Sequence, residues 1–321
     1  MTTGIRMMRD IFIEELYGRM HKDERIFFLS ADFGSPKLDQ LRWKFKNRFV
    51  NVGIAEQNLI NVATGLAIEG FTVYAYAIAP FLSMRAYEQI RINLAMFSQL
   101  KEINVNLVGV GAGLSYDVSG PTHHCLEDIS IIRTLPNMIV FSPSDEELAR
   151  SFVDYSIKIR KPKYIRFDSK KLPVIYKKSD NIQIENGFSQ LRRGKKICLI
   201  STGVMTHKAI KVAKKLDKCG IDIGIIDLFL LGDFDKTRLV DAVKKYKCVI
   251  TLEEAFINKG GLDSFILSIL DENHLKINLH RIGFKDKYVF DIGSREYLHR
   301  LKEIDEDSIV GLIKNIKSES L

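Results

Sequence analysis

The sequence predicts an α/β protein of two domains, each a mostly parallel sheet with helices on both faces. Short apolar runs of the kind that form strands alternate along the chain with segments whose apolar residues recur at helical spacing. This alternation is typical of parallel sheets covered by helices. The length of 321 residues, 46% of them hydrophobic and 27% charged, is sufficient for about two ordinary globular domains. A polar stretch over residues 169–195 interrupts the alternation and divides the chain.

The first domain is predicted over residues 1–178. Its strand candidates are short and apolar, and they cover residues 26–29, 49–52, 72–77, 105–110 and 138–141. Its helix candidates carry the apolar repeat of an amphipathic helix, and they cover residues 6–20, 56–69, 81–97 and 145–158. The last of these helices follows Pro143 and Ser144 and begins with acidic residues, which is typical of a capped N-terminus.

A connection is predicted over residues 179–196, with room for a short strand, and a second, smaller α/β domain over residues 197–321. The alternation restarts in this second domain. Its strand candidates cover residues 197–201, 221–228, 248–252 and 277–282. Its helix candidates cover residues 206–218, 236–246 and 261–270.

Composition argues against nucleic acid and membrane as partners. The net charge is +8, but the lysines are spread along the chain without the interleaved aromatic residues of a single-strand binding face. The chain contains no apolar run long enough to span a bilayer. Its four cysteines lack Cys-x-x-Cys spacing and are predicted to be reduced thiols. These features predict a cytoplasmic protein.

Residues 53–58, Gly-Ile-Ala-Glu-Gln-Asn, place a carboxylate where an apolar strand candidate turns into a helix. Glu56 is therefore predicted in the first helical turn, at the carboxyl edge of the sheet, where α/β proteins bind their ligands. The ordinary alternative is a solvated glutamate that complements the helix dipole.

A glycine-rich run, Val-Gly-Val-Gly-Ala-Gly over residues 108–113, resembles part of a dinucleotide-binding fingerprint. The full G-x-G-x-x-G pattern is not met because position 114 is leucine, and no helix pattern follows. The run instead predicts a loop whose backbone passes close to a ligand or a partner.

Residues 120–128, Gly-Pro-Thr-His-His-Cys-Leu-Glu-Asp, present two histidines after a turn. One interpretation is a metal site that combines His123 or His124 with Glu127 or Asp128, although the spacing does not match known zinc sites. A second is a loop histidine that transfers protons or binds substrate. A purely structural histidine is the third.

Three segments, residues 51–58, 81–89 and 120–123, resemble in this order the pyrimidine-binding domain of the transketolase family. The likeness is greatest to the C-terminal subunit of split, two-chain transketolases. Residues 201–203, Ser-Thr-Gly, begin a segment that resembles the transketolase C-terminal domain. The resemblance extends over essentially the whole chain, from about residue 6 to residue 315.

The resemblance implies thiamine diphosphate as the cofactor and assigns roles to residues that match the family motifs. Glu56 matches the glutamate that hydrogen-bonds the N1′ nitrogen of the aminopyrimidine ring. Phe81 matches the aromatic residue that stacks on that ring, and Ile54 and Arg85 are assigned to the cofactor site with it. His123 matches the loop histidine near the reacting substrate oxygens.

The resemblance also implies substrate contacts by His123, Ser119 and Arg166. Where the family has an acid before Gly-Pro-Thr-His, this chain has Ser119. The family arginine that grips the substrate phosphate falls near Ser169, with Arg166 close by in sequence. These departures predict a specialised sugar rather than a pentose-pathway sugar as the substrate.

The family holds the diphosphate and its Mg²⁺ through a Gly-Asp-Gly motif, which is absent from this sequence. The resemblance therefore implies that a second chain, the diphosphate-binding N-terminal type of transketolase subunit, supplies this half of the site. No metal ligand is expected in the present chain. The expected assembly is α2β2, with self-association of this chain.

The predicted function is that of the pyrimidine-binding subunit of a thiamine-diphosphate-dependent transketolase-like enzyme, which transfers a two-carbon ketol unit between small-molecule sugars. Two other enzymes remain as alternatives: the β subunit of a 2-oxoacid decarboxylating dehydrogenase and a deoxyxylulose-phosphate-synthase-like enzyme. A non-catalytic interaction or regulatory subunit is the alternative from another class.

Overall fold

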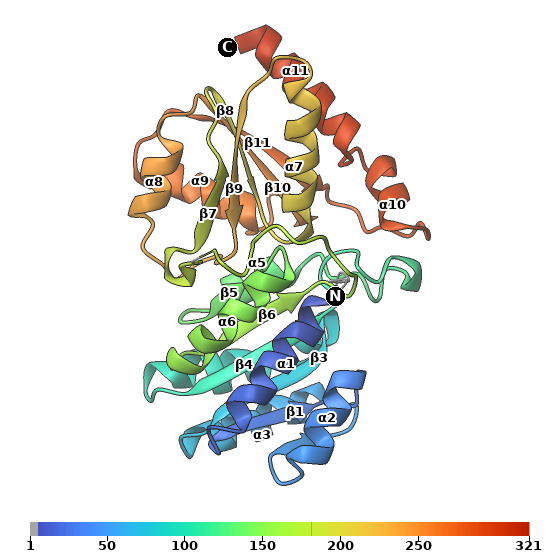
Figure 1. Ribbon diagram of the computed structural model, residues 1–321, viewed down its shortest axis with the longest axis vertical. Coiled ribbons are helices and arrows are strands. Elements are labelled where there is room, and N and C mark those ends of the chain that lie inside the picture. Colours follow the sequence, from blue (N-terminus) through green and yellow to red (C-terminus); the bar gives the residue numbers. More distant parts are fainter. Residues whose placement is uncertain (1–5, 181, 321) are drawn as a thin grey trace.

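The computed structural model describes residues 6–180 and 182–320, so residues 1–5, 181 and 321 of the predicted segments lie outside the described residues. Two sheets, each with its own helices, lie one above the other (Figure 1). The N-terminal part of the chain forms the lower sheet in this view, and the C-terminal part forms the upper one. The predicted fold class of two α/β units is confirmed.

The first sheet has six strands, all parallel, in the order β2-β1-β3-β4-β6-β5. The strands are β1 (Ile26–Ser30), β2 (Phe49–Asn51), β3 (Thr72–Ile78), β4 (Asn104–Val110), β5 (Ile139–Phe141) and β6 (Lys163–Phe167). β6, which lies between β4 and β5, was not among the predicted strands. Because all six strands are parallel, their carboxyl ends meet at one edge of the sheet.

Helices cover both faces of this sheet, and each face has its own apolar cluster. One cluster includes residues of α1 (Met8–Met20), α2 (Pro36–Lys44) and α6 (Glu146–Lys158). The opposite cluster includes residues of α3 (Glu56–Ile68) and α5 (Asp128–Arg133). Side chains alternate between the two faces along a strand, so Val73 and Ala75 of β3 belong to one cluster and Tyr74 and Tyr76 to the other.

The segment predicted as one helix over residues 81–97 is irregular. It begins with a π-helical turn, η1 (Phe81–Arg85), and continues as α4 (Tyr87–Gln89), a second π-helical segment, η2 (Ile90–Met96), and the 3₁₀ turn η3 (Phe97–Gln99). The prediction of a regular helix was wrong because π-helical hydrogen bonding from i to i+5 changes the angle between successive side chains. Met84, which α-helical spacing places beside Phe81, is 39% exposed.

The second sheet has five strands in the order β11-β10-β8-β9-β7. They are β7 (Phe188–Arg192), β8 (Ile197–Ser201), β9 (Ile223–Leu228), β10 (Cys248–Phe256) and β11 (Asn278–Phe284). Its helices are α7 (Val204–Asp217), α8 (Thr237–Val243), α9 (Leu262–Glu272), α10 (Arg295–Leu301) and α11 (Glu306–Ser320). The edge strand β7 pairs antiparallel with β9 and lies inside the predicted connection 179–196. The second sheet thus begins before residue 197.

The two sheets are joined by hydrogen bonds between β5 and the segment after β9. The Ser142 amide donates to the Phe229 carbonyl at 2.9 Å, and the Leu231 amide donates to the Val140 carbonyl at 2.9 Å. The Ser144 hydroxyl donates to the buried Asp227 carboxylate at 2.5 Å. Backbone pairing therefore continues from one half of the molecule to the other. Among the described residues, no helix has the length and apolar character needed to cross a membrane.

Candidate active site

Glu56 is the first residue of α3, and its side chain is only 3% exposed. The Arg85 guanidinium donates a hydrogen bond from Nη1 to Glu56 Oε2 at 2.7 Å. The Arg85 side chain itself is 47% exposed. The carboxylate is thus sheltered from water and has a charged partner that reaches the surface, which excludes a simple solvated glutamate at a helix start.

Arg85 and Phe81 belong to the same π-helical turn, η1, and lie against each other. The guanidinium carbon of Arg85 is 4.9 Å from the centroid of the Phe81 ring, which is a cation–π distance. Arg85 therefore contacts both the buried carboxylate and the aromatic ring. π-helical turns are frequent at functional sites.

His123 completes this group from a loop. Its imidazole ring meets the Phe81 ring edge to face, with 5.3 Å between centroids, and the Tyr116 ring at 6.3 Å. The Thr122 hydroxyl lies 3.1 Å from His123 Nδ1. Three segments far apart in sequence thus bring Glu56, Arg85, Phe81 and His123 into one series of contacts.

The loop that carries His123 is closed at its base by two backbone hydrogen bonds. The Gly113 amide donates to the Cys125 carbonyl at 3.1 Å, and the Cys125 amide donates to the Gly113 carbonyl at 2.9 Å. Gly113 has φ +57°, in the left-handed region that favours glycine. The Glu254 carboxylate of β10 comes so close that a β-carbon at Gly113 would collide with it. The glycine-rich run therefore accommodates a side chain of the second domain.

His124 and Asp128, two of the residues in the segment 120–128, have separate partners. His124 is buried, and its Nε2 lies 3.5 Å from the Asp117 carbonyl; burial lowers the pKa of this imidazole. Asp128 accepts hydrogen bonds from the Tyr164 hydroxyl and from Arg166 Nε, each at 2.8 Å. Of the side chains weighed for a metal site, His124 and Asp128 are thus engaged elsewhere.

The remaining predicted site residues have different surroundings. Ile54 is 74% exposed beside the Glu56 helix, and Ser119 is exposed on the His123 loop. Arg166 is 4% exposed and is paired with Asp128 in the interior. Burial alone would lower the pKa of Arg166, but the Asp128 carboxylate beside it raises that pKa above its ordinary value. This pairing argues against the expected substrate contact of Arg166, because its guanidinium is already bound inside the protein.

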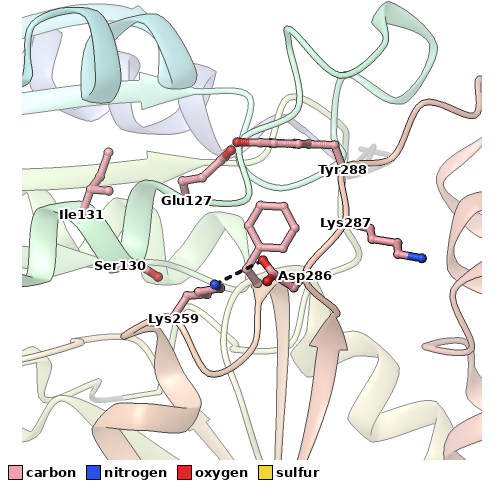
Figure 2. A pocket seen from close by; sticks show the side chains of 8 residues that line it. Glu127, Ser130, Ile131, Lys259, Asp286, Lys287 and Tyr288 are labelled. Carbon is pink, nitrogen blue, oxygen red and sulfur yellow. Dashed lines mark ion pairs between the residues drawn. The ribbon is translucent and has the colours of Figure 1, made fainter.

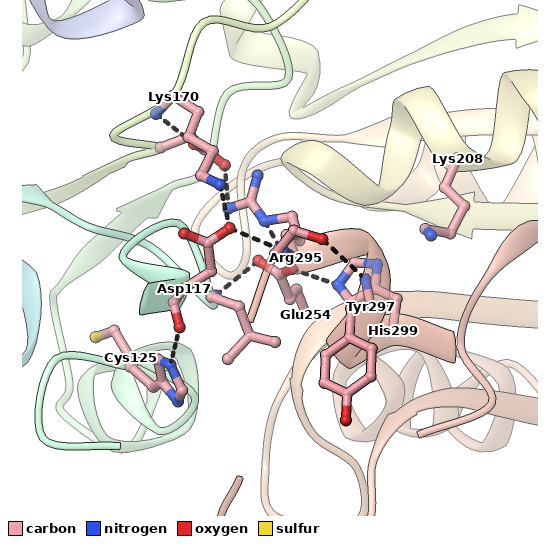
Figure 3. A network of polar contacts seen from close by, with 12 residues as sticks. Asp117, Cys125, Lys170, Lys208, Glu254, Arg295, Tyr297 and His299 are labelled. Carbon is pink, nitrogen blue, oxygen red and sulfur yellow. Dashed lines mark hydrogen bonds and ion pairs between the residues drawn. The ribbon is translucent and has the colours of Figure 1, made fainter. Parts of the chain in front are cut away.

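A network of charged side chains, which no sequence motif indicated, links the His123 loop to the second domain (Figure 3). Glu254 accepts the Leu114 amide at 2.9 Å and lies 3.1 Å from Arg295 Nε and 2.5 Å from His299 Nε2. Burial would raise the pKa of Glu254, but Arg295 and then His299 lower it to about 2. Asp117, on the loop, accepts the Arg295 amide at 2.7 Å and also binds Lys170.

A separate cavity of about 320 Å³ lies between the two halves, beside α5 (Figure 2). Its walls include Glu127 and Ser130 from the first half and Lys259 and Tyr288 from the second. Burial raises the pKa of Glu127. None of the residues in the Glu56 and His123 contacts lines this cavity.

Two family descriptions match the chain, one over each half. "Transketolase, pyrimidine binding domain" matches residues 6–174, and "Transketolase, C-terminal domain" matches residues 188–309. Together these matches extend over nearly all of the described sequence.

Individual relatives agree with the family match. The chain is 36% identical over 270 residues to an apulose-4-phosphate transketolase subunit of Actinobacillus succinogenes, a match that covers 84% of this chain and 85% of the relative. It is 30% identical over 293 residues to a 6-deoxy-6-sulfo-D-fructose transketolase subunit of a Clostridium species, covering 91% of this chain and 88% of the relative. A solved structure described as a split gene transketolase, inactive beta4 tetramer, is 30% identical with a TM-score of 0.86 and covers 97% of this chain and 98% of its own.

Proposed function

The chain belongs to the transketolase family, and on that premise we propose that it is the pyrimidine-binding subunit of a two-component enzyme that transfers a two-carbon ketol unit between sugars. The observation that carries the proposal is the contact series Glu56–Arg85–Phe81–His123. A buried carboxylate, an aromatic face and an imidazole at one edge of a parallel sheet suit the binding of thiamine diphosphate and the handling of protons beside it.

Each residue of the series has a task that its surroundings permit. Glu56 would hold the N1′ nitrogen of the aminopyrimidine through a shared proton, and its burial would keep water from competing for that bond. To make this bond, the Glu56 carboxylate either loses the hydrogen bond from Arg85 or keeps it on one oxygen while the other oxygen binds the ring. Phe81 provides a flat apolar wall for the pyrimidine ring, as aromatic side chains do for planar ligands. When bound, thiamine diphosphate supplies the carbon nucleophile that takes up the two-carbon unit.

His123 is the candidate proton carrier at the oxygens of the sugar. Imidazole exchanges protons near neutral pH, and the ring contacts of His123 hold it on the Phe81 side of the site. The Thr122 hydroxyl beside Nδ1 orients the ring, which directs the other nitrogen to a substrate. We propose Glu56 and His123 as the catalytic residues, with Phe81, Arg85 and Ile54 at the cofactor and Ser119 at the substrate.

A second chain is proposed to complete the site. The sequence contains no Gly-Asp-Gly motif, so the diphosphate and Mg²⁺ are assigned to that partner. Around the half-site, Ile54, Met84 and Val118 are 74%, 39% and 67% exposed, and such apolar surface is typical of a binding interface. One relative is named as a subunit of a transketolase, and another is described as a split gene transketolase in a beta4 tetramer. We propose an α2β2 assembly.

The sugar is proposed to lie outside the pentose pathway. The relatives named above act, by their names, on a phosphorylated and a sulfonated sugar. In this chain Arg166 is bound to Asp128, and Lys170 is bound to Asp117. Arg166 and Lys170, two of the cations near the expected phosphate position, therefore already have acidic partners, which favours a substrate that differs from xylulose 5-phosphate.

The test is reconstitution with the chain that carries Gly-Asp-Gly. We expect the mixture, with thiamine diphosphate and Mg²⁺, to transfer a ketol unit among a panel of ketoses and aldoses, and each chain alone to be inactive. Glu56→Gln should lower kcat by about 10²- to 10⁴-fold, the usual contribution of a positioned proton-transfer group. Arg85→Gln, which breaks the same ion pair but keeps the carboxylate, is the control and should lose much less.

Three outcomes would contradict the proposal: full activity of the isolated chain, decarboxylation of 2-oxoacids in place of ketol transfer, or near-normal turnover by Glu56→Gln. Efficient use of xylulose 5-phosphate with ribose 5-phosphate would contradict only the assignment of a specialised sugar.

A further inference from the structure

The His123 loop, residues 113–125, is attached to the second domain at two points. At its start, the Leu114 amide donates to Glu254 Oε2 at 2.9 Å. Further along, Asp117 Oδ2 accepts the backbone amide of Arg295 at 2.7 Å. Glu254 belongs to β10 and Arg295 begins α10, so both attachments join the loop to residues far away in sequence.

The groups that make these attachments are buried and charged. The Arg295 side chain is 5% exposed and binds two carboxylates, with Nη2 2.6 Å from Asp168 Oδ2 and Nε 3.1 Å from Glu254 Oε1. His299, 2% exposed, lies 2.5 Å from the same Glu254 oxygen. Removing one partner from a buried ion pair is costly because it leaves the other charge uncompensated, so this network favours one arrangement of the loop.

Gly113 makes the first attachment possible. A β-carbon at this position would collide with Glu254 Oε2 and lie 2.8 Å from Glu254 Cδ. Any side chain here would force the carboxylate away from the Leu114 amide, and φ +57° would be strained as well. The loop sequence is thus fitted to the carboxylate of the second domain.

We propose that Glu254 and Arg295 are positioning residues for His123, so that the second domain holds the imidazole in place against Phe81. The inference rests on the proposed function, because it assumes that His123 acts on the substrate. Neither Glu254 nor Arg295 touches the reacting groups; both act through the loop.

The loop itself transmits the attachment to His123. His124 Nε2 lies 3.5 Å from the carbonyl of Asp117, and the His123 amide donates to the Gly120 carbonyl at 3.0 Å. The two backbone hydrogen bonds between Gly113 and Cys125 hold the loop at its base, on the C-terminal side of His123. A shift of Leu114 or Asp117 therefore displaces the histidine, while Glu56 and Phe81 lie on other elements and stay in place.

The first experiment compares Glu254→Gln with Glu253→Gln in the reconstituted enzyme. The two residues are adjacent and buried, but Glu253 accepts the Leu262 and Asp263 amides and has no hydrogen bond to the loop among the described residues. For Glu254→Gln we expect kcat/KM for the donor sugar to fall by about 10²-fold, the cost of a small misplacement of a catalytic group. Affinity for thiamine diphosphate should be unchanged, and Glu253→Gln should match the wild type in both measurements.

The second experiment needs no activity. Amide hydrogen exchange of the full chain, followed by mass spectrometry, reports local opening segment by segment. In Glu254→Gln and in Gly113→Ala, exchange over residues 111–125 should accelerate while exchange over residues 56–68 stays at the wild-type rate. A merely destabilising substitution would instead accelerate exchange in both segments.

The outcomes separate the two proposals. If wild-type chains transfer no ketol unit, the proposed function fails, and exchange of residues 111–125 still decides the positioning role. If the wild type is active but Glu254→Gln matches Glu253→Gln in kcat/KM or in exchange of the His123 loop, only the positioning role is refuted, and the proposed function stands. Faster exchange in both segments, or loss of cofactor affinity, also refutes it.

Discussion

Two neighbouring carboxylates, Glu253 and Glu254, lie side by side in β10 and have opposite pKa shifts. Burial, followed by the nearby Asp263 carboxylate, raises the pKa of Glu253 to about 8. Burial acts on Glu254 in the same direction, but Arg295 and His299 outweigh it and lower that pKa to about 2. The charged partner, rather than the depth of burial, decides which acid is ionised at neutral pH.

The raised pKa of Glu253 predicts how stability depends on pH. Between the ordinary value of 4.5 and about 8, the folded chain keeps a proton that the unfolded chain releases. The free energy of unfolding therefore falls as pH rises through this window, by at most about 1.4 kcal/mol per pH unit, and levels off above it. Glu253→Gln should remove this fall, as measured by urea unfolding at a series of pH values.

The matched control for that series is Glu254→Gln. Because the pKa of Glu254 moves from its ordinary value of 4.5 to about 2 on folding, its effect on the pH dependence of stability belongs to more acidic solutions. Its replacement should leave the slope above about pH 5 as it is in the wild type. The same slope in Glu253→Gln as in the wild type would argue against a protonated Glu253.

At the same scale, the sequence motifs located Glu56, Phe81 and His123, and the structure brings these residues together. Sequence reasoning did not anticipate the burial of Arg166, because no local pattern reveals that Asp128 is its partner. It also missed Glu254, Arg295 and the network around them. Contacts between residues so far apart in sequence produce no periodicity or motif spacing. Only the glycine-rich run of residues 108–113 indicated that another group comes close to the backbone there.

At the scale of single elements, Asp145 has more than one task. As the N-cap of α6 it accepts the Leu148 amide at 2.9 Å, and its other oxygen accepts the amides of Ile175 and Tyr176 at 2.7 and 2.8 Å. One carboxylate thereby starts a helix and holds the segment that leads out of the first domain. The sequence predicted a capped start for this helix within residues 143–147, with the helix beginning at Asp145, but it did not predict Asp145 as the cap or the second attachment.

Asp145→Ala should consequently cost more than an ordinary cap. Loss of the cap and of acceptors for two further amides should lower the free energy of unfolding by about 2–4 kcal/mol. Ser35, which caps α2 through the Leu38 amide alone among the described hydrogen bonds, is the comparison, and Ser35→Ala should cost about 1 kcal/mol. Equal losses in urea titrations of the two variants would show that the contact with residues 175–176 contributes nothing.

Elements with strong patterns were predicted well, and irregular ones were not. The buried strands β1, β3 and β4 and helix α3 agree with their predicted segments within about two residues, since continuous apolar runs and amphipathic repeats mark them. The π-helical turns after β3 were merged into one predicted helix, and the edge strand β7 was anticipated only as room for a short strand in the connection. A π turn uses residues that also form α-helices, and a half-buried antiparallel edge strand has no continuous apolar run.

At the scale of the whole molecule, hydrogen bonds between β5 and the segment after β9 join the two halves in addition to the connecting chain. Residues 177–180 of that connection are exposed and outside any helix or strand. Tryptic cleavage after Lys177 or Lys178 should therefore leave the two fragments bound to each other, eluting together from a sizing column until urea is added.

Replacement of both lysines by glutamine is the control that identifies the cut. Fragments that separate in native buffer would mean that the connection keeps the halves together, and that the backbone hydrogen bonds between β5 and the segment after β9 do not. In that case the contacts of the His123 loop with Glu254 and Arg295 could not keep the loop bound to the second domain either.

The late position of Arg295 in the chain has a consequence for how the subunit is made. During synthesis, Glu56, Phe81 and His123 emerge from the ribosome long before α10. Domains fold from the N-terminus as they emerge. A chain that stops before α10 thus contains every residue proposed for the cofactor and the sugar, yet lacks the Arg295 guanidinium proposed to position the His123 loop. On the proposed positioning role, synthesis of α10, rather than folding of the first domain, is therefore the step that makes the subunit competent.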